Sequence, residues 1–425
     1  MKLSIRWRPW VRWFFPRLFV AATLYLGGYT ALNALLSARL SARMEAIRAR
    51  GEPFGPSDLA QPEVPSERDA GPYFRSACAL MEGLEPATRD VLGTYELDVR
   101  DRDEDGDPSF AWVDEELRPR STVAVDDWLR GEPALEALLA ELGRRPECRS
   151  TVAFDEDGPF TLLPHLGPAK ELARLSLAAA NGAAERGDAA RATRLQALGY
   201  SLAKCLYADR YCLISALVAE AVEGMAHDNL QLVMSRGGLG EAELDRIDAT
   251  LAGMPDMPAV YRDALIGERS GFGVFWFQAM IEGQSVSQAG KFSEATGILR
   301  LWLLADFDLY LDVLDQAIAV PWNEEDPSLD FKEFPSYSYV AYLLMPAMGK
   351  FRERLQRAEQ FRVLGRCALA LERERLERGR YPEELEARFA RAGVRYERSG
   401  EGFLLTAPHA EDAAPRDVVS FRVKR

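Results

Sequence analysis

Apolar residues recur along the middle of the chain at the spacing of one helix face. Three such stripes lie between residues 166 and 238, and a turn at Gly187 and Asp188 separates the first two. The stripes consist of Leu172, Leu175 and Ala179; of Leu195, Leu198, Leu202, Cys205 and Leu206; and of Ile214, Val218, Val222 and Met225. Each stripe needs a neighbouring helix to bury it, so the pattern predicts a helical-hairpin (TPR-like) array.

The pattern changes near residue 378. The preceding helical periodicity stops at Gly379, and Pro382 follows, as is usual at a helix end. Three short β-like runs come next, at residues 394–397, 403–406 and 418–423, and turn residues 400–402 join the first two. The predicted fold class is therefore mainly α, with an N-terminal transmembrane helix, the helical array and a small C-terminal antiparallel β-sheet.

An uncharged run from Leu18 to Leu36 precedes the array. As a helix it would span roughly 28 Å, close to the hydrocarbon thickness of a bilayer. Tryptophan, phenylalanine and basic residues precede the run, and four arginines follow it. We expect a membrane anchor with its N-terminus in the cytoplasm and the body outside. A cleaved signal peptide and a buried core helix are the alternatives.

These patterns divide the chain into five predicted segments. Residues 1–17 form a basic cytoplasmic segment, residues 18–36 the transmembrane anchor and residues 37–69 a stalk. The stalk includes a proline-rich stretch, residues 50–65, with four prolines. Residues 70–377 form the helical array, and residues 378–425 form the small β module.

Charge is unevenly spread along the 425 residues. The formal net charge is −14, but residues 1–50 carry +8 and the remainder carries −22. An acidic body repels nucleic-acid phosphate, so we expect no nucleic-acid partner. The expected partners are membrane lipid, contacted through Leu18 to Leu36, and other envelope or membrane-complex proteins.

Two stretches resemble known proteins. Residues 164–217, with PHLGPAKELARLSL, RGDAARA and LISAL, resemble uncharacterised membrane-anchored helical proteins of planctomycete-like bacteria. Residues 369–385, LALERERLERGRYPEEL, resemble the helix-to-sheet junction of type II secretion pseudopilins. This sequence lacks the pseudopilin processing site before its N-terminal helix. The first resemblance implies a fold and no activity, and the second implies a shared α/β module without a role in secretion.

One acidic loop has the spacing of a calcium-binding loop. Its alternating carboxylates are Asp101, Asp103, Asp105 and Asp107. Alternate carboxylates with a glycine between them resemble the start of an EF-hand, because they converge on one hard cation. Trp112 stands where an EF-hand carries its bidentate acid. The loop is the one candidate metal site, for calcium, with solvated acidic surface as its alternative.

Two further features leave alternatives open. Asp308, Asp312 and Asp315 share one face of a predicted helix, where like charges repel. Solvent is the simplest compensation, and an arginine surface or a cation is the alternative. Residues 271–280 are too densely apolar for one amphipathic face, so the run is either fully buried or a docking surface for a membrane or partner.

Recognisable catalytic motifs are missing from the sequence. It has no nucleotide-binding, α/β-hydrolase or zinc-protease motif, and its three histidines lack zinc-like spacing. We therefore single out no catalytic residue. We expect a single-pass, extracytoplasmic scaffold or interaction protein of the bacterial inner membrane. The alternative is an exported hydrolase or metal-dependent enzyme that uses carboxylates in a groove of the array.

Overall fold

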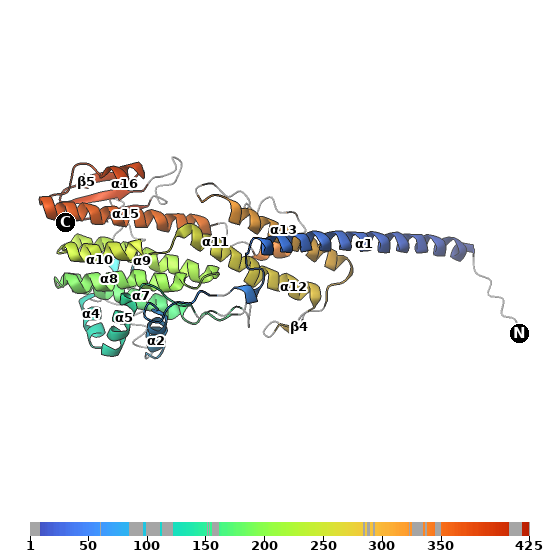
Figure 1. Ribbon diagram of the computed structural model, residues 1–425, viewed down its shortest axis with the longest axis horizontal. Helices are drawn as coiled ribbons and strands as arrows, with labels where there is room; N and C mark the ends of the chain where they lie inside the picture. Colours follow the sequence, from blue (N-terminus) through green and yellow to red (C-terminus); the bar gives the residue numbers. More distant parts are fainter. Residues whose placement is uncertain are drawn as a thin grey trace. The chain divides into compact units, whose positions relative to one another are not determined.

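The computed structural model divides the chain into two compact units (Figure 1). The long-helix unit comprises Met1–Leu59, Ala153–Thr161 and Leu265–Gly349, and the array unit comprises Ala60–Val152, Leu162–Ala264 and Lys350–Arg425. The structure describes residues 9–59, 61–84, 97–98, 111–112, 122–150, 152, 154, 161–283, 285–286, 290–291, 294–322, 324, 335, 338–344, 350–407 and 419–424. The candidate calcium loop, with Asp101, Asp103, Asp105 and Asp107, lies outside these residues.

Helices that follow one another along the sequence form most of the array unit. They are α2 (Gly71–Glu82), α4 (Thr122–Arg130), α5 (Pro133–Arg144), α7 (Leu166–Glu185), α8 (Ala189–Tyr207), α9 (Leu213–Arg236), α10 (Glu241–Ala252), α15 (Phe351–Arg378) and α16 (Ala387–Arg391), with α11 (Met257–Gly267) shared between the units. α7 packs on α8, and α8 on α9 (Figure 1). The predicted mainly helical fold is confirmed.

The turn between α7 and α8 forms where the sequence predicts it. Gly187 has a φ of +75°, and the Asp188 carboxylate accepts a hydrogen bond of 3.1 Å from the backbone N–H of Arg191. Left-handed glycine and an aspartate cap are the usual end and start of consecutive helices. Gly182 allows close packing here, because a Cβ at that position would overlap the backbone of Thr122.

Burial follows the predicted stripes on α7 and α8 but departs from the stripe predicted on α9. There Val222 is buried, whereas Ile214 is exposed and Val218 and Met225 are half-buried. The buried face of α9 is instead made of small and polar residues as well as apolar ones. It includes Ser215, Ala216, Ala219, Glu223, Ala226, His227 and Asn229. The predicted α9 stripe is wrong because this helix buries polar groups that find partners on other helices.

The predicted C-terminal sheet is present. β5 (Arg395–Ser399), β6 (Gly402–Thr406) and β7 (Ser420–Val423) form a three-stranded antiparallel sheet in that order. Its buried side chains include Phe403, Leu405 and Phe421. The backbone N–H of Arg422 donates a hydrogen bond of 2.8 Å to the Gln231 side chain, which ties β7 to α9. Two-residue strands β1 (Leu97–Asp98) and β2 (Ala111–Trp112) pair elsewhere in this unit.

The long-helix unit is dominated by two long helices, α1 and α13. Its elements are α1 (Pro9–Ala49), η1 (Pro56–Asp58), the π-helical turn η3 (Glu268–Gly273), α12 (Val274–Glu282), β3 (Ser285–Val286), β4 (Gly290–Lys291), α13 (Gly297–Ala319) and α14 (Tyr339–Leu344). Among the described residues, α1 is the helix long and apolar enough to cross a membrane, as a signal sequence also would be. It continues to Ala49, so the first part of the predicted stalk is helical.

The acidic stripe of α13 faces arginines of α1. Asp308, which is 6% exposed, pairs with Arg39 at 2.8 Å and with Arg43 at 3.0 Å. Arg43 also pairs with Asp312 at 2.7 Å. Asp315 pairs with Arg50 at 3.2 Å and with the buried Arg269 at 2.7 Å. Arginines, rather than solvent alone, therefore compensate this stripe.

The apolar run at residues 271–280 supplies part of the core of the long-helix unit. Val274 and Phe277 are buried, and the Phe277 ring stacks on Phe307 with 4.6 Å between centroids. Gly273 is required here, because a Cβ would overlap the ring of Tyr310. The neighbouring Trp276 is half-buried. Burial therefore accounts for most of this run.

Candidate binding site

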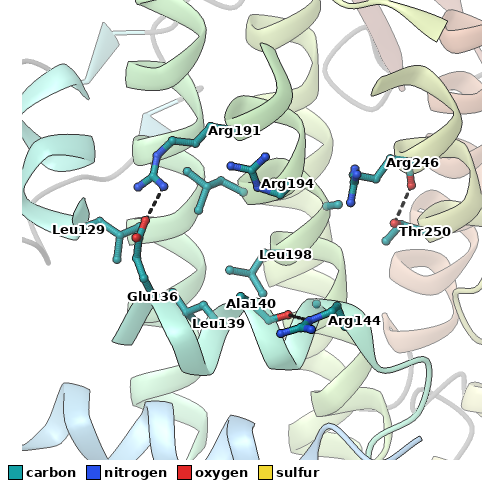
Figure 2. Close-up of a pocket in the computed structure, with 13 residues that line it drawn as sticks. Leu129, Glu136, Leu139, Ala140, Arg144, Arg191, Arg194, Leu198, Arg246 and Thr250 are labelled. Carbon is teal, nitrogen blue, oxygen red and sulfur yellow. Dashed lines mark hydrogen bonds and ion pairs between the residues drawn. The ribbon is translucent and has the colours of Figure 1, made fainter. Parts of the chain in front are cut away.

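One cavity of the array unit brings arginines and leucines together. The arginine pocket, of about 420 Å³, lies among α4, α5, α8 and α10. Its charged lining is Glu136, Arg144, Arg191, Arg194 and Arg246, and its apolar lining is led by Leu129, Leu139, Leu195 and Leu198. Figure 2 shows Arg191, Arg194 and Arg246 along one side of the hollow, opposite Leu139, Ala140 and Arg144. A concave apolar surface with a few polar groups is typical of a ligand site.

Helix α8 supplies the central side chains through its spacing. Arg191, Arg194, Leu195 and Leu198 lie at i, i+3, i+4 and i+7, and such residues share one helix face. The Asp188 cap fixes where α8 begins and hence which face these residues occupy. The sequence thus places two guanidinium groups and two leucines side by side.

Arg191 is held rigidly at the edge of the pocket. It is 7% exposed, and its Nε donates a hydrogen bond of 2.6 Å to the fully buried Asp126. Its Nη1 pairs with Glu136. Its Nη2 is buried and has no hydrogen-bond partner in the part of the protein that the structure describes. A buried donor without a partner is costly, so a side-chain shift that opened this nitrogen to the pocket would favour an anionic ligand.

Arg194 and Arg246 differ from Arg191 in their exposure to solvent. Both side chains are exposed, and neither forms an ion pair with the described residues. By contrast, Arg366 and Arg373 line another cavity but already pair with Asp248, at 2.9 and 3.1 Å. The arginine pocket therefore differs from the neighbouring basic surface in having cationic groups that remain available.

A second cluster of the array unit surrounds Asp209. His165 Nε2 lies 2.6 Å from the Asp209 carboxylate, which also accepts hydrogen bonds from Ser150 at 2.5 Å and Ser215 at 2.8 Å. A cavity of about 310 Å³ beside it is lined by Cys78, among other residues. Burial raises the pKa of the Cys78 thiol to about 12, so it is protonated at neutral pH and a poor nucleophile.

A third cluster is fully enclosed. Arg362 contacts both carboxylate oxygens of Glu223, at 2.5 and 2.8 Å, and the Tyr207 hydroxyl donates to the same carboxylate at 3.0 Å. His227 Nε2 lies 3.4 Å from Glu223, and Tyr200 contacts the other ring nitrogen at 3.1 Å. Every member has a partner within the cluster, which makes it a structural element.

The pKa shifts of Glu223 and His227 support a structural role for this third cluster. Burial alone would raise the pKa of Glu223, but hydrogen bonds and charge from Arg362 and His227 lower it to about 2. Burial lowers the pKa of His227, so the ring is neutral at pH 7. An ionised acid paired with arginine and a neutral histidine bonded within the same cluster hold α8, α9 and α15 together.

The sequence-based candidates and the arginine pocket do not overlap. The four aspartates of the calcium loop lie outside the described residues, and no group of His, Cys, Asp and Glu within those residues could hold a metal ion. The arginine pocket was not predicted from the sequence. The basic and apolar face of α8 could have been recognised from residue spacing. The position of Arg246 on α10 beside that face could not, because that position depends on how the helices pack.

No family model, curated protein or solved structure matches this protein. The resemblances to planctomycete membrane proteins and to pseudopilins therefore stay predictions, and so does the hydrolase alternative.

Proposed function

We propose that this protein is a single-pass, membrane-anchored helical binding protein of the bacterial inner membrane. Helix α1 holds it in the bilayer, with its N-terminus in the cytoplasm and its body outside. The array unit binds another envelope protein by accepting an acidic and apolar segment in the arginine pocket. The single observation that carries this proposal is the set of available guanidinium groups beside leucines.

The chemistry of the pocket defines the partner segment. An aspartate, glutamate or terminal carboxylate would pair with the exposed Arg194 and Arg246, and a shift of Arg191 would open its buried Nη2 to the same carboxylate. An adjacent apolar side chain would cover Leu139 and Leu198. Arginines around an apolar centre are characteristic of the energetically dominant spots of protein interfaces.

The charge distribution of the protein favours an acidic partner segment over a basic one. The part of the protein beyond residue 50 carries −22, so an acidic segment approaches only where cations gather locally. The arginine pocket is such a place, because four arginines accompany one glutamate in its lining.

The test uses the full-length protein in lipid nanodiscs and short labelled peptides in which aspartate alternates with leucine. Replacement of Arg194 and Arg246 by alanine should weaken binding by roughly twofold to thirtyfold, since exposed ion pairs contribute about 0.2–1 kcal/mol each. The matched control replaces the exposed Arg391 and Arg398, which lie outside the pocket, and should leave the affinity unchanged.

The same measurement separates the possible sources of the ligand. Free aspartate and dodecanoate serve as competitors of the peptide. Competition by dodecanoate at lower concentration than the peptide would identify a small amphiphile as the ligand and overturn the protein partner. Equal weakening in the control variant would show that only overall charge matters.

Topology has its own test. Protease added to intact spheroplasts should digest the part of the protein that follows α1, because the proposed body lies outside the cytoplasm. Protection that persists until the membrane is opened would place the body in the cytoplasm and refute the proposed orientation.

A further inference from the structure

The register between α1 and α13 can be read from their contacts within the long-helix unit. Arg300, in the first turns of α13, donates a hydrogen bond of 3.2 Å to the Asn33 side chain. Further along, Arg43 pairs with Asp308, and Arg50 with Asp315. Residue numbers rise together on both helices, so the two run parallel and side by side (Figure 1).

This register matters because Asn33 belongs to the uncharged run of α1 that ends at Leu36. If that run crosses the bilayer, the start of α13 lies at the same depth as the last turn of the membrane span. The ion pairs of Asp308 begin about 12 Å further along the helix, at 1.5 Å per residue. Those charges are therefore clear of the hydrocarbon.

The side chains at the start of α13 suit that depth. Ile298 is 69% exposed and Leu299 is 53% exposed. Outside α1, the other large exposed apolar or aromatic side chains described in this unit are Tyr339 and Tyr342 of α14. Tyrosine is enriched at membrane interfaces, where its ring meets lipid and its hydroxyl meets water.

Helix α14 is fixed against α13 by a carboxylate. Asp306 accepts hydrogen bonds from the backbone N–H groups of Val340, at 2.8 Å, and Ala341, at 3.3 Å. This holds the two tyrosines between the exposed start of α13 and its charged end. From Ile298 onward the order along the unit is thus apolar residues, then tyrosines, then ion pairs, which is the order of a bilayer boundary, and the exposed Glu294 precedes α13.

The charge of Arg300 is compatible with a position of the start of α13 at the membrane boundary. Its Nε is bonded to Asn33, and its Nη1 donates to the backbone oxygen of Ile281 at 3.3 Å. A guanidinium group that is hydrogen-bonded within the protein can lie at the headgroup level.

We propose that the long-helix unit touches the membrane a second time: Ile298 and Leu299 of α13 insert into the bilayer interface beside α1, and Tyr339 and Tyr342 lie at its edge. This inference rests on the proposed anchoring by α1. The occupant of the exposed apolar surface is lipid, because the surface continues the lipid-facing run of α1. A second copy of the protein or a partner protein would be a different occupant.

The test is fluorescence of the full-length protein in vesicles of phosphatidylethanolamine and phosphatidylglycerol. The dye NBD is attached to Ile298→Cys or, separately, Leu299→Cys. Leu26→Cys on α1 reports the anchor, and Leu162→Cys, exposed in the array unit, reports water. The wild-type protein, labelled in parallel, corrects for the native cysteines. Vesicles with and without doxyl-labelled lipid reveal which dyes touch lipid.

NBD at residues 298 and 299 should shift to the blue and lose fluorescence with doxyl lipid, as at residue 26, while residue 162 should show neither change. Quenching at residue 26 alone would overturn the second contact and leave the anchor standing. A blue shift without quenching at residues 298 and 299 would mean that protein covers them. No quenching at residue 26 would refute the anchoring, and the second contact with it.

Discussion

The two units of this protein arrange their ion pairs differently. The array unit encloses them: Asp126 and Glu223 are fully buried, and arginines contact both. The long-helix unit arranges them along one seam, where Arg43 and Asp308 join α1 to α13. Large exposed apolar residues are scattered singly in the array unit but adjoin each other, as Ile298 and Leu299 do, on α13.

Under the proposed anchoring, the difference would reflect two solvents. Water on all sides favours a closed polar interior and isolated apolar residues at the surface. A bilayer at one end favours lipid-facing apolar residues there and charges beyond the boundary. We therefore expect substitutions of charged residues to cost most in the array unit, and Glu223 and Glu268 to give opposite pH dependences.

The largest expected effect is that of Arg362→Ala. The change leaves Glu223 buried and ionised without its main partner, which should cost about 3–5 kcal/mol. Hydrogen exchange of α9 at pH 7, in the full-length protein, measures this locally. Arg378→Ala removes an exposed pair with Glu374 and should cost at most about 1 kcal/mol. Similar losses in both variants would contradict the enclosed network.

The Glu223 carboxylate also sets a pH dependence. Its pKa in the folded protein is about 2, against an ordinary value of 4.5. The folded state therefore gains stability from this group above pH 4.5 and loses it as the pH falls towards 2. Arg362→Ala should make α9 less sensitive to acid over that window.

The long-helix unit should show the opposite trend at Glu268. Burial raises the pKa of its carboxyl group to about 8, and that group has no hydrogen bond or ion pair with the described residues. Its contribution to stability is complete below pH 4.5 and is lost as the pH rises through 8. Glu268→Gln should therefore stabilise η3 and α12 at pH 7 by as much as roughly 3 kcal/mol.

Hydrogen exchange of these helices at pH 5 and pH 8 checks this expectation. The gain should be larger at pH 8. Glu294→Gln, at an exposed position of the same unit, is the control and should change neither value. A destabilised Glu268→Gln variant at pH 8 would show that the carboxyl group is ionised and stabilising.

The next effect in size is that of Asp308→Ala. As solvated surface this change would be neutral within about 0.5 kcal/mol. The nearly buried position of Asp308 against Arg39 and Arg43 instead predicts a loss of about 1.5–3 kcal/mol. Asp312→Ala, at a part-buried pair that is more open to solvent than Asp308, should cost about 0.2–1 kcal/mol. Protection of α13 in detergent micelles gives both values, and equal effects would refute the distinction.

Sequence patterns predicted the parts of this fold that depend on local periodicity. The stripes of α7 and α8, the cap at Asp188 and the strands of the C-terminal sheet follow from residue spacing alone. The α9 face was missed because its inner residues, such as Glu223 and His227, look like a polar surface. Only their partners on other helices, such as Arg362, make burial favourable.

The dependence on contacts between helices also explains why the arginine pocket was not predicted from the sequence. Four alternating aspartates form a recognisable motif within one short segment of sequence. Arg194 and Arg246 form no such motif, because they come together only when α8 and α10 pack side by side. A pocket between helices forms only through tertiary packing. A single helix face, such as the one with Arg191 and Leu198, supplies only part of the pocket lining.

A charge-swap titration tests the proposed binding function most directly. The full-length protein in nanodiscs, with Arg194→Glu and Arg246→Glu together, is titrated with labelled peptides in which leucine alternates with aspartate or with lysine. The account predicts that the wild-type protein prefers the aspartate peptide by roughly tenfold and that the variant reverses this preference, because each swapped pair exchanges attraction for repulsion. Equal affinities of both proteins for both peptides would contradict the arginine pocket as the binding site.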